Sequence, residues 1–309
     1  TPCLVNGRFR ADHFQQEQKN LRDIIESLMD DKMAYAEERC NQEMCKDEPY
    51  GIFEYGRIED IDKVTSASLA EHHARVLRTA PMDIFVAGQF DPDKIQKSLA
   101  WTFRSFKHLH KGIEAFKPLP PVPLRDNLAA RSGSRPETPQ GRGITRFASP
   151  FGDAHRRTAS NGVAPVEPRI IKESQPIDQG KLVIGLRTNI TWSDDAIFDL
   201  MVANGVLGGF PHAKLFRNVR EKEGLAYYAS SNLEKTKGLM MIRAGINHDK
   251  FDKALAVIKD QISAVQQSDI SDSEMSDTKK GIITRLETMD DNPGALINFH
   301  EELLLNQRE

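Results

Sequence analysis

Residues 119–172 lack the hydrophobic periodicity of helices and strands, and this stretch divides the chain into two blocks. It opens on closely spaced prolines and continues with mixed Gly, Ser, Arg and Pro, as in residues 131–136. Such a segment buries too little apolar surface to offset the entropy that is lost when it becomes ordered. We therefore predict an interdomain linker with a disordered middle, flanked by globular blocks at residues 1–118 and 173–309.

Strand and helix signals alternate along the second block. The predicted elements are a strand at 181–188, a helix capped by Ser193 and ended by Gly208-Gly209, a helix at about 212–223, strands at about 225–233 and 238–246, a helix whose apolar stripe runs from Phe251 to Val265, and a helix opened by a capping box at Ser271–Glu274 and broken by Pro293. This order is typical of an α+β unit, in which helices pack on a largely antiparallel sheet.

The first block is mainly helical in its pattern. Apolar residues at helical spacing predict a helix over roughly 14–45 and another over 66–79. The apolar run at 83–88 ends in glycine and is predicted to be a strand. Asp91 begins a further predicted helix, whose apolar face carries Ile95, Leu99, Phe103 and Phe106.

Charge balance and cysteine count exclude several classes of protein. Charged residues make up 28% of the chain but nearly cancel, leaving a net charge of −3, so no overall field attracts nucleic acid or a membrane surface. The apolar runs are far shorter than the roughly 18 residues that a membrane-spanning helix needs. Cys3, Cys40 and Cys45 are too few for a disulfide framework. We interpret them as structural thiols in a reducing, cytoplasmic setting.

The most specific segment is Lys214–Tyr227, which reads KLFRNVREKEGLAY. It resembles the C-terminal-half signature of the insulinase/pitrilysin (inverzincin) metallopeptidases, in which a helix ending in Arg-x-x-x-Gly-Leu-Ala-Tyr leads into a strand. The resemblance covers about 175–309 and implies two related halves, each a mostly antiparallel sheet packed with helices. It also implies that Arg220 and Tyr227 contact substrate, the Arg at a carbonyl or acidic group and the Tyr as a hydrogen-bond donor. Without the resemblance, the two would be interpreted as ordinary surface and core residues.

The first block resembles the later part of the family's N-terminal half. This resemblance rests on the helix from Phe14, the acidic pair Asp30-Asp31 and the segment ending at Asp91. Residues 47–56 are similar to a bacterial subgroup, one example of which is associated with the 5-aminopentanol modification of elongation factor P, and whose members often lack the metal motif. The resemblance implies that residues 1–118 are the latter part of the N-terminal half and that 173–309 form an incomplete C-terminal half.

The zinc motif of active family members is His-x-x-Glu-His, in which two histidines four residues apart bind the metal. None of the nine histidines here lies four residues from another, and we interpret His72-His73 as helix-surface residues. Aligning the family's acidic pair with Asp30-Asp31 keeps the outer glutamate as Glu17 but puts Ile24 where the third zinc ligand belongs. Because isoleucine cannot bind a metal, we expect no cofactor and no catalytic residue, whereas active relatives hold zinc.

Three functions remain open on the sequence. The favoured one is a non-catalytic family member that binds peptide or protein and pairs with a second insulinase-family subunit in a heterodimer, or with itself in a homodimer. The first alternative is an active zinc metalloendopeptidase whose His-x-x-Glu-His helix lies upstream of Thr1, with Glu17 or Glu26 replacing the missing ligand. The second is a translation-associated adaptor that acts through the arginines of the linker, although the near-neutral charge argues against a nucleic-acid partner.

Overall fold

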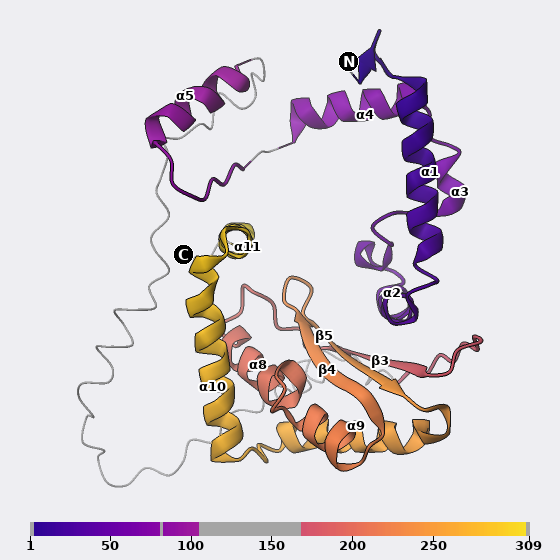
Figure 1. Ribbon diagram of the computed structural model, residues 1–309, viewed down its shortest axis with the longest axis vertical. Helices are drawn as coiled ribbons and strands as arrows, with labels where there is room; N and C mark the ends of the chain where they lie inside the picture. The colour runs from indigo at the N-terminus through magenta and orange to yellow at the C-terminus, as the bar shows by residue number, and fades with distance from the viewer. Residues whose placement is uncertain (1–2, 81–82, 105–167, 307–309) are drawn as a thin grey trace, which may run out of the picture.

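The computed structural model describes residues 3–80, 83–104 and 168–306. Most of the predicted linker, with its predicted disordered middle, lies outside the described residues, and so does Phe106. We call 3–104 without its gap the first region, and 168–306 the second region. Helices combine with small antiparallel sheets (Figure 1), which confirms the α+β class. In the described ranges, no helix combines the length and the apolar character needed to cross a membrane.

A three-stranded antiparallel sheet forms the centre of the second region. Its strands are β3 (Gly180–Arg187), β4 (Ala226–Glu234) and β5 (Leu239–Ile246), arranged in the order β3-β5-β4. The turn between β4 and β5 ends at Gly238, whose φ of +70° suits a residue without a Cβ. All three predicted strands are therefore confirmed.

Helices cover one face of this sheet (Figure 1). They are α8 (Ile197–Asn204), the π-helices Gly205–Gly209 and Leu215–Lys222, and α9 (Phe251–Gln266). The first π-helix packs directly on β4, because a Cβ on Gly208 would lie 2.6 Å from the backbone nitrogen of Ser231. Side chains from every layer close the core, including Leu200, Leu215, Ile242 and Ile258, all at most 1% exposed.

The sequence predicted where the first of these helices ends and which residue caps it, and only the end is correct. The helix ends at Gly209 as expected, but Ser193 is not its cap, since α8 begins at Ile197 after Ala196. The reason is a local turn in which the Asp194 carboxylate accepts hydrogen bonds from the backbone and hydroxyl of Thr191. That turn uses the residues that would otherwise have started the helix.

The second region continues into two further helices. α10 (Asp272–Glu287) begins with the predicted capping box between Ser271 and Glu274. After a 3₁₀ turn, α11 (Pro293–Leu305) starts with proline at its first position, and Asn292 caps it by accepting a hydrogen bond from the Ala295 backbone.

The first region is helical apart from two very short strands. Its elements are β1 (Leu4–Val5), β2 (Arg8–Phe9), α1 (Ala11–Ser27), α2 (Lys32–Met44), a 3₁₀ turn at Pro49–Gly51, α3 (Ile58–Ile61), α4 (Ser66–Thr79) and α5 (Pro92–Thr102). The helix predicted over 14–45 is thus two helices. They separate because the Asp31 side chain accepts hydrogen bonds from the backbones of Met33 and Ala34 and starts a new helix.

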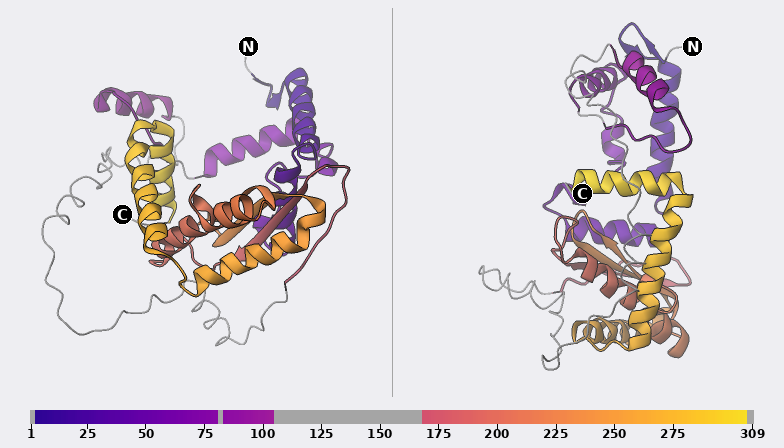
Figure 2. Two further views of the ribbon diagram at one scale, coloured as in Figure 1. Left: turned by 60° about the horizontal axis from the view of Figure 1, so that its bottom comes forward. Right: turned by 90° about the vertical axis from the view of Figure 1, so that its left-hand side faces the viewer.

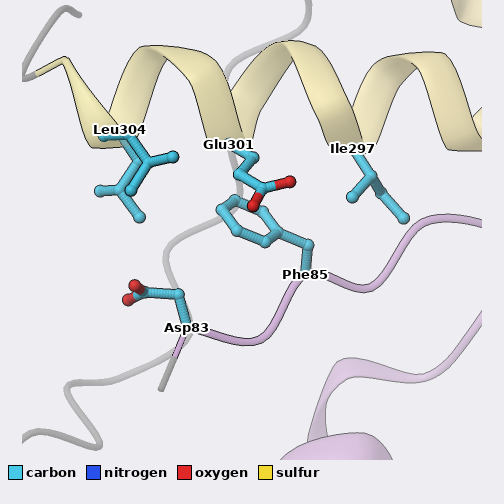
Figure 3. Close-up of a pocket in the computed structure, with 6 residues that line it drawn as sticks. Asp83, Phe85, Ile297, Glu301 and Leu304 are labelled. Atoms are coloured by element: carbon cyan, nitrogen blue, oxygen red, sulfur yellow. The ribbon is translucent and has the colours of Figure 1, made fainter. Parts of the chain in front are cut away.

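The strand predicted at 83–88 is wrong, because these residues adopt no regular strand. A strand is stabilised by a neighbour that satisfies its backbone, and none lies beside this segment among the residues described. Instead, Phe85 points toward Glu301 of α11, and Asp83 lies below Leu304 (Figure 3). Together they line a shallow space of about 330 Å³. Apolar sequence alone did not distinguish a strand from an extended segment that packs on a helix.

The two regions meet where α2 lies over the sheet face opposite to α8 and α9 (Figures 1 and 2). The contact is close, since a Cβ on Gly185 of β3 would lie 2.0 Å from the sulfur of Met44. The arrangement therefore has three layers: α2, the sheet, and the helices that bury the core.

Candidate functional site

Arg220 lies in the last turn of the π-helix Leu215–Lys222. The helix is anchored by Leu215 and Val219, both fully buried, so the opposite side faces solvent. Gly224, with a φ of +57°, ends the helix, and its backbone nitrogen donates to the Arg220 carbonyl at 3.2 Å. The exposed Arg220 guanidinium lies 4.4 Å from the centre of the Phe216 ring. π-helical turns are frequent at functional sites, because they shift a side chain out of the regular α-helical spacing.

Tyr227 lies at an irregularity in the register of β4. Ala226 pairs with Ile246 and Tyr228 pairs with Gly245, which leaves Tyr227 as the extra residue of a bulge. Its side chain is 60% exposed. Bulges turn side chains away from the regular alternation of a strand and are common beside active sites. The structure thus brings Arg220 and Tyr227 to one corner of the sheet, joined by a short turn, with both side chains accessible.

Tyr228 points to the side of the sheet that α2 covers. Its ring lies against Gly245, where a Cβ would approach within 2.6 Å of the ring. Burial raises the pKa of the Tyr228 hydroxyl, and the nearby charges of Asp31 and Glu37 raise it further. The corner that presents Tyr227 to solvent therefore continues directly into the contact between the regions.

Ile24 lines a separate space, which we call the Ile24 hollow. This hollow has a volume of about 400 Å³ and lies between α1, α2 and the segment after the 3₁₀ turn. Its walls are formed by Ile24, Ser27, Leu28, Asp31, Ala34, Glu37, Glu38, Asn41, Phe53, Glu54 and Tyr55. Ile24 is 43% exposed and faces this space. Glu17 and Glu26 are exposed residues of α1 that do not line it.

These residues do not fit a zinc ion. Ile24 has no donor atom, no histidine or cysteine lines the hollow, and the described ranges contain no group of three or more His, Cys, Asp or Glu side chains that is placed to hold a metal. His13 is exposed on α1. His72 lies 2.8 Å from an Arg75 nitrogen, and His73 packs edge-on against Phe9, as surface residues of α4 do.

Sequence reasoning missed the ion pairs that hold α2 on the sheet. Glu37 pairs with Arg243 of β5, while Glu48 pairs with both Arg187 of β3 and Lys237 of the β4–β5 turn. Two further pairs join the regions, Arg39 with Glu173 and Glu43 with Arg169. The partners lie more than a hundred residues apart, so sequence periodicity gave no signal for them. Basic residues within the strands β3 and β5 were the one available hint.

Two of these glutamates have opposite electrostatic environments. Hydrogen bonds from Lys237 and Arg187 lower the pKa of Glu48. Burial raises the pKa of Glu37, and this effect outweighs the attraction of Arg243. The contact therefore destabilises the charged carboxylate of Glu37 and stabilises that of Glu48.

The thiols near this contact are free. Cys45 is fully buried, Cys40 is partly buried against Gly185, and Cys3 is exposed. Burial raises the pKa of the Cys40 thiol, which disfavours the reactive thiolate. The prediction of free structural thiols is confirmed for Cys40 and Cys45.

Comparisons with known proteins give consistent matches. A family profile described as "Peptidase M16 inactive domain" matches residues 63–282. The Bacillus subtilis (strain 168) protein named "Probable inactive metalloprotease YmfF" is 32% identical over 291 residues, which is 94% of this chain and 58% of that protein. A Mycobacterium bovis protein named "Uncharacterized zinc protease Mb2805c" is 24% identical over 276 residues, covering 88% of this chain and 53% of that protein.

A solved structure is also similar. The crystal structure of a conserved protein from Enterococcus faecalis V583 matches with a TM-score of 0.69 and 27% identity, covering 98% of this chain and 61% of that one. The chain thus spans somewhat more than half the length of the relatives it matches. Similarity covers both regions, not the second alone.

Proposed function

The chain belongs to the peptidase M16 family, the insulinase/pitrilysin family that Lys214–Tyr227 predicts, and on that premise we propose that it is a non-catalytic member that binds peptides. One observation carries the proposal. Arg220 and Tyr227 are presented to solvent at one corner, whereas Ile24 stands at the position that the family resemblance aligns with a zinc ligand. A peptide-binding surface can persist in a protein that lacks the side chains needed to bind zinc.

The proposed contact uses the two groups in different ways. The Arg220 guanidinium has several N–H donors for a substrate carbonyl or carboxylate, and the Phe216 ring limits its motion. The Tyr227 hydroxyl is a single donor held by the bulge. Because a carbonyl occurs at every residue of a peptide, these contacts suit peptides of varied sequence, and a carboxylate adds a stronger partner for Arg220.

The wider setting is part of the same proposal. We propose that residues 1–118 correspond to the latter part of the family's N-terminal half, that 119–172 are a linker, and that 173–309 belong to the C-terminal half. The partner is a second M16 subunit, catalytic or identical, that closes a chamber around the peptide. Three free, unpaired thiols suit a cytoplasmic location.

Peptide binding and cleavage can be measured together. Labelled peptides of mixed composition are incubated with the protein and zinc, with and without a chelator. We expect binding by fluorescence anisotropy and no cleavage. Arg220→Gln and Tyr227→Phe should each weaken binding about five- to tenfold, the cost of one lost hydrogen bond of roughly 1 kcal/mol.

Matched controls lie close by. Arg217→Gln removes a second exposed arginine from the same helix, and Tyr55→Phe removes another half-exposed hydroxyl. Neither should change the affinity. Equal losses from Arg217→Gln and Arg220→Gln would contradict the proposed contact, and chelator-sensitive cleavage would favour an active zinc peptidase instead.

A further inference from the structure

The sheet face beneath α2 carries several cations. Lys181, Arg187 and Arg243 lie on it, and Lys237 adds a further charge at the β4–β5 turn. The face is also shallow, because Gly185 and Gly245 carry no side chain there. It combines cations with glycine positions on which other side chains pack closely, Met44 at Gly185 and Tyr228 at Gly245, whereas the opposite face is occupied by the apolar core.

The segment that covers this face is acidic where it touches. α2 and the turn after it supply Glu37, Glu43 and Glu48 to arginine or lysine partners in the second region. Arg187 also donates to the Met44 carbonyl at 2.6 Å, which satisfies the C-terminal end of α2. α2 therefore shows which groups this face of the sheet binds: spaced carboxylates and a backbone carbonyl at a helix end.

The cover is held by ion pairs arranged around a small apolar patch. The pairs of Glu48 with Arg187 and Lys237 are partly exposed, so water weakens them, and burial of Glu37 offsets part of its attraction to Arg243. No backbone ladder joins α2 to the sheet in the described residues. The apolar part of the contact is a small patch, in which Met44, Cys40 and the fully buried Cys45 pack on the side of the sheet that carries Gly185, Leu239 and Met241.

We propose that the basic sheet face is a binding surface for acidic peptide segments, and that α2 is a displaceable intramolecular occupant of that surface. The proposal rests on the proposed peptide-binding function and names its ligand class. The face begins at Tyr228, the residue after Tyr227, so a peptide bound at Arg220 and Tyr227 extends along it. Burial of Glu37 raises its pKa, in keeping with an occupant whose charge is imperfectly matched.

Two cysteines make displacement measurable. Cys40 and Cys45 lie under the contact, and Cys3 is exposed. In a Cys3→Ser protein, labelling of the fully buried Cys45 therefore reports whether α2 has lifted, and the partly buried Cys40 sets the baseline rate. A nine-residue peptide, matched to the length of β4, is made in a glutamate-rich version and in a version with every Glu replaced by Gln. The acidic peptide should accelerate labelling about fivefold in a saturable manner, the scale set by losing two weak ion pairs, and the Gln version should not.

Two pairs of substitutions separate the cover from the surface. Glu37→Gln with Glu48→Gln weakens the cover only, so labelling should become fast without peptide and the acidic peptide should bind about fivefold more tightly. Arg187→Gln with Arg243→Gln also frees α2, but it removes the surface, so the acidic peptide should lose its advantage over the Gln version. Circular dichroism, and tryptophan fluorescence in a Trp101→Phe background where Trp192 reports alone, check that both proteins keep the second region folded.

The outcomes distinguish this inference from the proposed function. If both peptides bind equally, depend on Arg220 and Tyr227, and leave the thiols protected, the acidic surface is wrong and peptide binding stands. If Glu37→Gln with Glu48→Gln does not raise the acidic peptide's affinity, α2 is not a competing cover. If neither peptide binds to any of these proteins, both proposals fail.

Discussion

The two regions of this molecule obtain their order in different ways. The second region buries a continuous apolar core between its sheet and helices. In the described part of the first region, the buried apolar residues are Cys45, Ile61 and Ala70 alone, and Cys45 is buried at the contact with the second region. Ile24, Val76 and Trp101 of the first region are at least 41% exposed. The first region thus depends on local hydrogen bonds and on its seat on the sheet, whereas the second is stabilised from within.

Each region contains one tryptophan, which allows the comparison to be tested directly. Trp192 is 4% exposed in the second region, and Trp101 is 68% exposed in the first. In a Trp101→Phe background, urea unfolding followed by tryptophan fluorescence reports the second region alone. Circular dichroism reports the helices of both regions.

The largest expected effect is from a cavity in the second region. Ile258 is fully buried in α9, so Ile258→Ala should lower the free energy of unfolding measured by Trp192 by about 2–5 kcal/mol. Val76 is 41% exposed in α4, and Val76→Ala should change the same transition by less than about 0.5 kcal/mol. Similar losses from the two substitutions would break the comparison, because the regions would then share one core.

The same difference determines how far the fold could be predicted from sequence. The apolar stripe of α9, from Phe251 to Val265, packs on a core assembled from the same region, and its prediction is confirmed. The run at 83–88 is also apolar, but no strand lies beside it among the residues described, and its prediction is wrong. The local sequence pattern was sufficient to predict an element where the surface it packs against comes from the same region of the chain.

In the candidate site too, locally determined features were predicted from sequence and features that depend on distant packing were not. The motif at Lys214–Tyr227 placed Arg220 and Tyr227 at a helix end and a strand start, which is where they lie. The sequence did not reveal the π-helical turn, which packs against β4, or the bulge, which lies where β4 pairs with β5. The pairing of Glu37 with Arg243 was also out of reach, since it depends on how α2 seats on the sheet.

A smaller loss is expected from a charged pair inside the second region. Lys214 and Glu274 join the second π-helix to α10 at 3.0 Å, with side chains 9% and 12% exposed. Lys214→Met leaves the Glu274 carboxylate without its cation and should cost about 3 kcal/mol by Trp192 unfolding. Lys214→Met combined with Glu274→Leu should recover about half or more of that loss, because no unpaired charge remains and the remaining deficit is the lost capping box with Ser271, about 1 kcal/mol. A double variant as unstable as the single one would show that packing, not charge, is responsible.

The pair also predicts a pH dependence. Burial alone would raise the pKa of Glu274, but hydrogen bonds from the Ser271 backbone and Lys214 outweigh it and hold that pKa below its ordinary value of 4.5. A lowered carboxylate pKa adds stability that is complete above the unfolded pKa and is lost as the pH falls through the folded one. Glu274→Gln should therefore reduce the stability difference between neutral pH and pH values below 4.5. An unchanged difference would show that other carboxylates govern acid unfolding.

The smallest expected effect compares two capping boxes, one in each region. Thr65 and Ser68 open α4, and Ser271 and Glu274 open α10. Either cap replaced by alanine should cost its helix about 1 kcal/mol. In the second region the loss is shared by the whole cooperative unit, so Ser271→Ala should shift the Trp192 transition. In the first region the helix has little core to transmit the loss, so Thr65→Ala should raise amide hydrogen exchange at the start of α4 and leave Trp192 unfolding unchanged. If Thr65→Ala shifted both measurements, the first region would be coupled to the core despite its exposed apolar side chains.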